Sequence, residues 1–327
     1  MKIRILLLGI ALATGIMAEA VVPEIPEITA DDEWGLVRIP VASLRRSGRH
    51  AAELMTQAVM GTPVRVLRDT TEFVNVQTPE GYTGWLPKSS IVRKSADEMR
   101  MWQDAERYII TDPWQQTLRR TAAGTAPRDV VSDLVNGSIV VATPDSTGRY
   151  MHVYLPDGRE GFLPTDVLTP VAEWAAQDFD AQKILDIAYS MEGAPYLWGG
   201  MSTKAPDCSG LVKISYFANG LILKRDASQQ AKTGTRIEAS DWPSCRAGDL
   251  LFFGNPVTGK VTHVGIYDHD GQYVHSSELV RRNSLDPEAD NYLTKPFFHA
   301  VRIDGNQGSD GITRAADHPW YFNITRP

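Results

Sequence analysis

The sequence predicts an α+β protein in which two small β-barrels precede a domain of helices followed by an antiparallel sheet. The chain has 327 residues, 43% of them hydrophobic and 22% charged, which is typical of a globular protein of two or three domains. An internal repeat of β-rich segments occupies the first half. From Trp174 onward the pattern changes to two amphipathic helices and then to strand-like segments at 250–253, 262–267, 272–275 and 300–303.

The repeat in the first half predicts the two barrels. The segment 74–87, which contains PEGYTGWLP, returns 77 residues later at 151–164, which contains PDGREGFLP. Each copy combines an alternating strand, a Gly-containing turn, a Gly-aromatic pair and a Leu-Pro stop. The shared ending resembles bacterial SH3-like domains, so we expect a first SH3-like domain at 31–95 and a second at 125–170.

Residues 96–124 are expected to connect the barrels through a helix that packs them together. The segment 95–98 is a capping box, and apolar residues follow at helical spacing until Pro113. Trp102 and Trp114 in this connector can stack on sugar rings, but packing in a core or interface is the stronger interpretation.

The start of the chain has the pattern of a cleavable secretory signal. Lys2 and Arg4 precede an apolar run over 5–18, and Ala18-Glu19-Ala20 follows it. The run is too short for a comfortable membrane span, nothing later approaches about 18 uninterrupted apolar residues, and no nearby cysteine can accept a lipid. We therefore expect residues 1–20 to be removed, and the protein to be exported to the periplasm or secreted without a membrane span.

Charge and cysteine content exclude several function classes. There are 33 Lys and Arg residues against 40 Asp and Glu residues, a net charge of -7, which argues against nucleic acid as a partner. The two cysteines, Cys208 and Cys245, are too few for a disulfide framework or a four-thiolate zinc site. Each cysteine therefore serves either packing or chemistry.

Cys208 is placed in the first turn of a helix expected over 207–219, within a domain expected over 174–327. Asp207 is a good N-cap, and apolar residues begin at Leu211. Unpaired backbone N–H groups and the helix dipole favour a thiolate there, the form that a cysteine nucleophile needs. A lone cysteine is more often a small buried residue, so the catalytic interpretation requires a base.

Two histidines on successive expected strands supply a candidate base. If the segment 268–271 forms a three-residue hairpin loop, His275 lies opposite Gly265 and diagonal to His263, and the glycine leaves room for the rings to meet. One alternate register would separate the rings, and either histidine alone is better interpreted as a half-buried sheet residue. A metal site formed by the histidines and one cysteine is a weaker alternative, because the spacing matches no recognised ligand pattern.

Together these residues resemble the NlpC-type cysteine peptidases of bacterial cell walls, over about 180–303. The similar segments, in chain order, are Tyr196-Leu197-Trp198-Gly199-Gly200, Asp207-Cys208-Ser209-Gly210, Arg225-Asp226, Gly248-Asp249-Leu250-Leu251-Phe252-Phe253 and Thr262-His263-Val264-Gly265-Ile266-Tyr267. The resemblance implies a papain-like α+β catalytic domain. Two SH3-like domains before such a domain are similar to the arrangement in γ-D-glutamyl-L-diamino-acid endopeptidases of the dipeptidyl-peptidase VI type.

The resemblance also implies roles for individual residues. Cys208 corresponds to the nucleophile, His263 to the base and His275 to the residue that orients it. The implied substrate contacts are Tyr196 and the Cys208 N–H at the oxyanion, Asp226 at the free amino terminus of L-Ala, Ser209 and Trp198 in the pocket, and Glu53 and Tyr82 from the first SH3-like domain. A solvated surface role for Glu53 is an equal alternative. Ala227 departs from the family, which often carries serine there, so a substrate hydrogen bond is expected to be lost or replaced, with an effect on the preference for the second residue of the peptide.

The expected function is that of a cysteine endopeptidase that hydrolyses the γ-D-Glu–L-diamino acid bond of peptidoglycan-derived stem peptides, without a cofactor. One alternative is a cell-wall-binding SH3-like protein with a degenerate catalytic domain. A related amidase or acyltransferase is another, because fold does not determine substrate. The intact Cys208, His263 and His275 favour the enzyme, and Cys245 matches no functional position.

Overall fold

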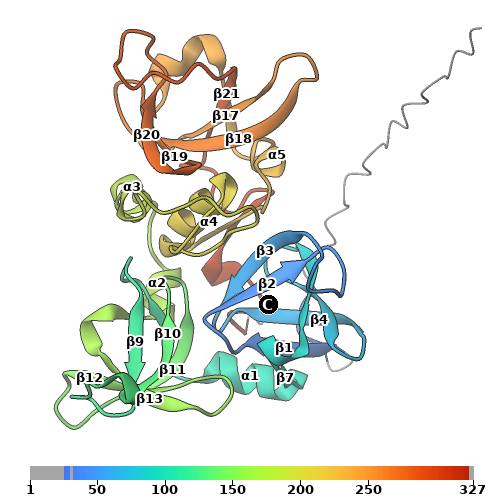
Figure 1. The fold of residues 1–327 in the computed structure, drawn as a ribbon, viewed down its shortest axis with the longest axis vertical. Helices are drawn as coiled ribbons and strands as arrows, with labels where there is room; N and C mark the ends of the chain where they lie inside the picture. Colours follow the sequence, from blue (N-terminus) through green and yellow to red (C-terminus); the bar gives the residue numbers. More distant parts are fainter. Residues whose placement is uncertain (1–25, 30–31, 324–327) are drawn as a thin grey trace, which may run out of the picture.

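Three structural units follow one another along the chain in the computed structural model (Figure 1), which describes residues 26–29 and 32–323. Two are β-rich and lie side by side, and the third, which carries the helices α3 and α4, lies above them in the view. The expected signal segment, 1–20, lies outside the described residues. Within the described ranges, every helix is too short or too polar to cross a bilayer.

The first β-rich unit is an antiparallel sheet of seven strands in the order β3-β2-β6-β5-β4-β1-β7. Its strands are β1 (Glu33–Val37), β2 (Val41–Arg45), β3 (Leu54–Val59), β4 (Pro63–Asp69), β5 (Phe73–Gln77), β6 (Thr83–Pro87) and β7 (Ile91–Lys94). In β2, the buried Ala42 and Leu44 alternate with half-buried residues, as expected for a strand with one face on a core.

The second β-rich unit repeats this topology strand for strand, in the order β10-β9-β13-β12-β11-β8-β14. Its strands are β8 (Arg107–Ile110), β9 (Gln116–Arg119), β10 (Val130–Leu134), β11 (Ile139–Pro144), β12 (Tyr150–Tyr154), β13 (Glu160–Pro164) and β14 (Leu168–Pro170). The two copies of the sequence repeat occupy β5 with β6 and β12 with β13. The prediction of two β-rich units related by an internal repeat is therefore confirmed.

The segment between the two sheets differs from the expected connector. The helix α1 (Ala96–Asp104) begins at the predicted capping box, with Ser95 as N-cap, but ends well before Pro113. The next residues form β8, because Arg107–Ile110 pairs with β11 and β14, and β9 also joins the second sheet. Strand pairing overrides the helical spacing of the apolar residues here.

A buried cluster joins all three units. It contains Trp34, Leu36, Met99, Trp102, Ile109, Ile139, Val171, Trp174, Ala175, Ile222, Ala315, Trp320 and Tyr321. Trp102 of α1 thus packs at the interface, as the stronger interpretation predicted, whereas Trp114 is 65% exposed. Because the cluster takes side chains from both sheets and from the C-terminal unit, it holds the first sheet against the domain that carries Cys208.

The C-terminal unit packs helices on one face of an antiparallel six-stranded sheet in the order β16-β21-β17-β18-β19-β20, which confirms the α+β prediction. Its elements are α2 (Val171–Ala175), α3 (Ala181–Ser190), α4 (Cys208–Ala218), β15 (Leu221–Leu223), α5 (Ala227–Gln230), β16 (Thr235–Glu238), β17 (Leu250–Asn255), β18 (Lys260–Tyr267), β19 (Gln272–Ser277), β20 (Leu279–Ser284), β21 (Phe297–Arg302) and β22 (Ile312–Arg314). The core between helices and sheet places the start of α4 beside β18 and β19.

Candidate active site

Cys208 is the first residue of α4 and is only 8% exposed. The Asp207 carboxylate caps the helix by accepting the Gly210 N–H at 2.7 Å, as the sequence predicted. The backbone N–H groups of Ser209 and of Val264, on the neighbouring strand β18, act on the Cys208 thiol by lowering its pKa. Cys208 therefore lies where the start of the helix meets the sheet.

Burial decides the protonation state of this thiol. Burial, and after it the nearby Asp207 carboxylate, raises the pKa of Cys208 to about 11. The two backbone N–H groups and Arg225 lower the pKa, but by less. Desolvation thus opposes the thiolate that the helix N-terminus is expected to favour. Attack by the sulfur requires a base that takes the proton as the new bond forms.

That base is available in a hydrogen-bonded pair of histidines. His263 Nε2 lies 2.6 Å from His275 Nδ1, and His275 Nε2 lies 2.8 Å from Asn283 Oδ1 on β20. The Asn283 amide is itself oriented, because its nitrogen donates to the carbonyl of Asn291 at 2.6 Å. An amide oxygen only accepts, so His275 carries its proton on Nε2 and its Nδ1 accepts from His263 Nε2–H. The lone pair of His263 then lies on Nδ1.

The hairpin that brings the two rings together has the predicted register. Asp268 N–H donates to the Gln272 carbonyl at 2.8 Å and closes a three-residue loop. Ile266 pairs with Val274, which places His275 across from Gly265. A Cβ on Gly265 would lie 3.2 Å from the His275 Cβ and 2.8 Å from the Tyr273 ring, so a larger residue would displace the imidazole.

Both imidazoles are neutral at physiological pH. Burial lowers the pKa of His263 well below its usual range and that of His275 to about 4. The positive charges of Lys295 and Arg281 act in the same direction on both histidines. Arg281 lies on β20, directly across from His275. The charged sequence of this strand, LVRRNS, has no clear strand pattern, so the sequence predicted neither the strand nor the role of Asn283.

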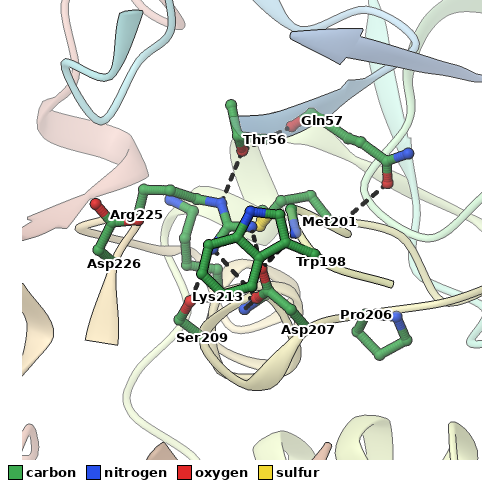
Figure 2. Close-up of polar contacts among 12 residues, drawn as sticks. Thr56, Gln57, Trp198, Met201, Pro206, Asp207, Ser209, Lys213, Arg225 and Asp226 are labelled. Atoms are coloured by element: carbon green, nitrogen blue, oxygen red, sulfur yellow. Dashed lines mark hydrogen bonds and ion pairs between the residues drawn. The ribbon is translucent and has the colours of Figure 1, made fainter. Parts of the chain in front are cut away.

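Sequence reasoning also missed the role of Arg225, which it quoted only as part of a motif. Arg225 Nη2 and Nη1 donate to the two Asp207 carboxylate oxygens at 2.6 and 3.2 Å (Figure 2). Nη1 also donates to Ser209 Oγ at 2.7 Å, and Nε donates to Thr56 Oγ1 of the first sheet at 2.8 Å. The Ser209 hydroxyl in turn donates to Asp207, so its contacts place it in this network, although the sequence predicted a pocket-lining role.

Asp226, the predicted amine-binding residue, is half-buried at the start of α5 and receives a contact from the first sheet. The Tyr82 hydroxyl lies 3.5 Å from Asp226 Oδ1 and donates to it. Burial raises the pKa of Asp226, and Arg225 opposes that rise. The structure thus brings together two residues that lie far apart in the sequence and that both carry predicted substrate roles.

Glu53 also contacts the C-terminal unit. Its Oε1 accepts from Trp198 Nε1 at 3.2 Å, while Oε2 pairs with Arg46 Nη2 at 2.7 Å. Trp198 is 62% exposed, so its indole forms an open surface beside the carboxylate. The first sheet therefore reaches the catalytic unit at Glu53 as well as at Tyr82, although Arg46 balances the Glu53 charge.

Tyr196, the predicted oxyanion donor, is half-buried, and its backbone N–H donates to the Glu278 carbonyl at 2.9 Å. Burial, and then the neighbouring Cys208, raises the pKa of the Tyr196 phenol, which keeps its proton available for donation. Cys245 is a free, buried cysteine in a separate cluster with Phe253 and Tyr267. Over the described ranges, no three His, Cys, Asp or Glu side chains gather as metal ligands would.

A buried thiol at the start of α4 and a neutral, oriented imidazole on the adjacent strand β18 are the groups that cysteine hydrolases use. The profile of the NlpC/P60 family matches residues 193–302, and that of the bacterial dipeptidyl-peptidase SH3 domain matches residues 44–91. The "Probable endopeptidase NlpC" of Escherichia coli (strain K12) is 39% identical over 121 residues, 36% of this chain and 75% of that protein. The chain therefore belongs to the NlpC/P60 family of cysteine peptidases.

Similarity to other proteins extends over the first β-rich unit as well. The "Gamma-D-glutamyl-L-lysine dipeptidyl-peptidase" of Bacillus subtilis (strain 168) is 28% identical over 232 residues, 68% of this chain and 72% of that protein. The crystal structure of an NlpC/P60 family protein from Bacillus cereus ATCC 10987 superposes with a TM-score of 0.69 at 19% identity and covers 83% of this chain and 99% of that one. The overall fold of this chain is thus similar to that of a solved structure.

Proposed function

We propose that this protein is a cysteine endopeptidase that hydrolyses the bond between γ-D-Glu and an L-diamino acid in cell-wall stem peptides with a free N-terminal L-Ala. The observation that carries the proposal is the contact between Asp226 and Tyr82, which closes a half-buried carboxylate against another structural unit. Such a carboxylate suits a substrate ammonium group at a closed end of the site. The relatives named as dipeptidyl-peptidases include a γ-D-glutamyl-L-lysine enzyme, and this name supports cleavage of the same bond.

The proposed reaction begins with the Cys208 sulfur attacking the γ-carbonyl carbon of D-Glu while His263 Nδ1 takes the thiol proton. The Tyr196 hydroxyl and the Cys208 N–H stabilise the oxyanion. The C–N bond then breaks, and the proton on His263 passes to the departing amine of the diamino acid. A water molecule, deprotonated by His263, hydrolyses the thioester and regenerates the thiol. His275 and Asn283 keep the His263 ring oriented through both steps.

Substrate choice follows from charge. A stem peptide whose L-Ala is amide-linked to muramic acid brings no ammonium group to Asp226, and its longer chain meets the wall formed by Tyr82, Glu53 and Trp198. A half-buried carboxylate that meets no ammonium group is destabilised, so free peptides are strongly preferred. Released peptides, rather than intact strands, are the proposed substrates, and the secretory pattern of residues 1–20 supports action outside the cytoplasm.

Mass spectrometry of the products from defined peptides tests the proposal. The peptides are L-Ala-γ-D-Glu-L-Lys, its meso-diaminopimelate analogue, the N-acetylated form of each, and a muramoyl-linked tripeptide. We expect release of L-Ala-D-Glu from the free peptides. Cleavage between muramic acid and L-Ala would instead support an amidase, and binding to cell walls without hydrolysis of any peptide would support the binding-protein alternative.

A further inference from the structure

Arg225 joins the nucleophile's helix to a different structural unit. Its side chain is almost fully buried, at 2% residue exposure, and its guanidinium uses all three nitrogens in hydrogen bonds. Two of them hold Asp207 and Ser209, which flank Cys208, and the third holds Thr56 on β3 of the first sheet (Figure 2). One side chain therefore connects the first sheet with the residues on both sides of the nucleophile.

The contact with Asp207 matters for the Cys208 sulfur because the Asp207 carboxylate both caps the N-terminus of α4 and places a negative charge near the thiol. Its carboxylate orients the first turn of α4 through the Gly210 N–H and also accepts the Gly199 N–H at 2.9 Å. The same negative charge lies beside Cys208 and opposes formation of a thiolate. The Arg225 cation, in bidentate contact, fixes the position of that carboxylate and offsets its charge.

Thr56 holds the arginine from the other side. Thr56 is fully buried, and its hydroxyl accepts the Arg225 Nε–H at 2.8 Å. A second buried contact joins the same two units, because Glu80, in the turn before β6, forms an ion pair of 3.3 Å with Lys213 of α4. The first sheet thus meets the nucleophile's helix and its cap at two desolvated polar points, where a lost partner is costly.

We propose that Arg225 is a positioning residue for Cys208, and that Thr56 of the first SH3-like unit is the residue that holds Arg225 in its working geometry. The first SH3-like unit then contributes to the reactivity of the nucleophile as well as to the substrate pocket. The inference rests on the proposed function only where peptide hydrolysis is measured, because the reactivity of Cys208 can be measured without any peptide.

The test uses Thr56→Val, which keeps the shape of the side chain and removes the hydroxyl. Substitution of Arg225 itself can prevent folding, because it leaves the Asp207 charge buried and unpaired. Thr56→Ser restores the hydroxyl. The matched control is Gln57→Leu, because Gln57 makes a contact of the same kind between the same units, accepting the Met201 N–H at 3.0 Å, without touching Arg225.

We expect Thr56→Val to slow alkylation of Cys208 by iodoacetamide at pH 7 by about tenfold and to shift its pH profile upward, the range expected when a buried donor loses its partner. The value of kcat should fall by a similar factor with little change in KM. Thr56→Ser and Gln57→Leu should alkylate at nearly the wild-type rate. Circular dichroism and thermal melting confirm that each variant is folded, and the Cys245→Ala background restricts the alkylation signal to Cys208.

Three outcomes would overturn the inference. The first is a Thr56→Val protein that melts at a lower temperature but alkylates like the wild type, which would make the contact merely structural. The second is equal slowing in Thr56→Val and Gln57→Leu, which would assign the effect to loosened docking of the units. The third is a Thr56→Ser protein that stays slow. If the alkylation series behaves as expected but the wild type cleaves none of the peptides, the proposed function fails and the inference stands.

Discussion

His263 and His275 share a hydrogen bond of 2.6 Å between Nε2 of the first ring and Nδ1 of the second. A second imidazole, itself held by Asn283, therefore determines which nitrogen of His263 carries the proton. Because burial keeps both rings neutral and raises the pKa of the Cys208 thiol, the site starts from a neutral thiol and a neutral base.

The first prediction concerns the reacting groups. Cys208→Ala and His263→Ala should each reduce peptide hydrolysis by about a thousandfold or more, since one removes the nucleophile and the other the base. Both variants should remain folded. Cys245→Ala should stay active, because Cys245 packs in a separate cluster. Product release from L-Ala-γ-D-Glu-L-Lys measures all three, and hydrolysis by pure Cys208→Ala protein would rule out the assigned nucleophile.

His275→Ala should have a milder effect, because this residue orients the base and does not transfer the proton. We expect a loss of kcat of about ten- to a thousandfold, the range for a supporting residue of this kind. Asn283 is one hydrogen bond further from the base than His275, so Asn283→Ala should reduce kcat less than His275→Ala does. Steady-state kinetics of the two variants check this order, and the reverse order would contradict the proposed chain of hydrogen bonds.

The pH dependence of kcat/KM, which reports ionisations of the free enzyme, follows from the lowered histidine pKa values. His263 must be neutral to accept the thiol proton, so activity is lost as the pH falls through its pKa, which lies well below 6.5. We therefore expect full activity at pH 6.5 and a fall only at lower pH. Lys295→Met removes a positive charge that lowers this pKa and should move the acidic limb upward, whereas the exposed Lys260→Met should not. An acidic limb unmoved in Lys295→Met would contradict the assignment.

Asp226 should control the choice between free and acylated peptides. The wild type should prefer the free tripeptide over the N-acetylated one by about a thousandfold in kcat/KM, because acylation leaves the carboxylate unpaired. Asp226→Ala should lose most activity on the free peptide and much of the preference, and Tyr82→Phe should show a smaller loss of both. Equal wild-type rates on the two peptides would leave a general wall hydrolase.

His318 should make the fold sensitive to acid. This histidine is buried, donates from Nε2 to the Pro79 carbonyl at 2.9 Å, and accepts the Trp320 N–H at 3.1 Å. Burial lowers its pKa from 6.5 to about 4. The unfolded chain therefore binds a proton that the folded chain does not, so stability is full above pH 6.5 and falls, by about 3 kcal/mol, as the pH drops to 4.

Urea unfolding at several pH values checks this prediction. His318→Gln should be less stable than the wild type at pH 8, but its stability should fall less between pH 6.5 and 4. The exposed His50→Gln serves as the control and should keep the wild-type slope. An unchanged acid slope in His318→Gln would show that other groups account for acid unfolding.

The sequence by itself determined the features that depend on local pattern and short spacing. The repeat predicted two β-rich units, Asp207 and the apolar residues after it predicted the helix that begins at Cys208, and the short loop after Tyr267 predicted the histidine register. These features can be predicted because helix caps, turns and the alternation of apolar and polar residues each depend on only a few neighbouring residues.

Only the tertiary structure decided the contacts between units and the charges at the site. The strand β8 exists because β11 and β14 pair with it, and Asn283 reaches His275 from a strand with no clear pattern of its own. Thr56 contacts Arg225, which lies 169 positions later in the sequence. Burial raises the pKa of Cys208, whereas the start of the helix favours the thiolate. Desolvation and long-range pairing depend on what the rest of the chain places around a residue, which no local pattern contains.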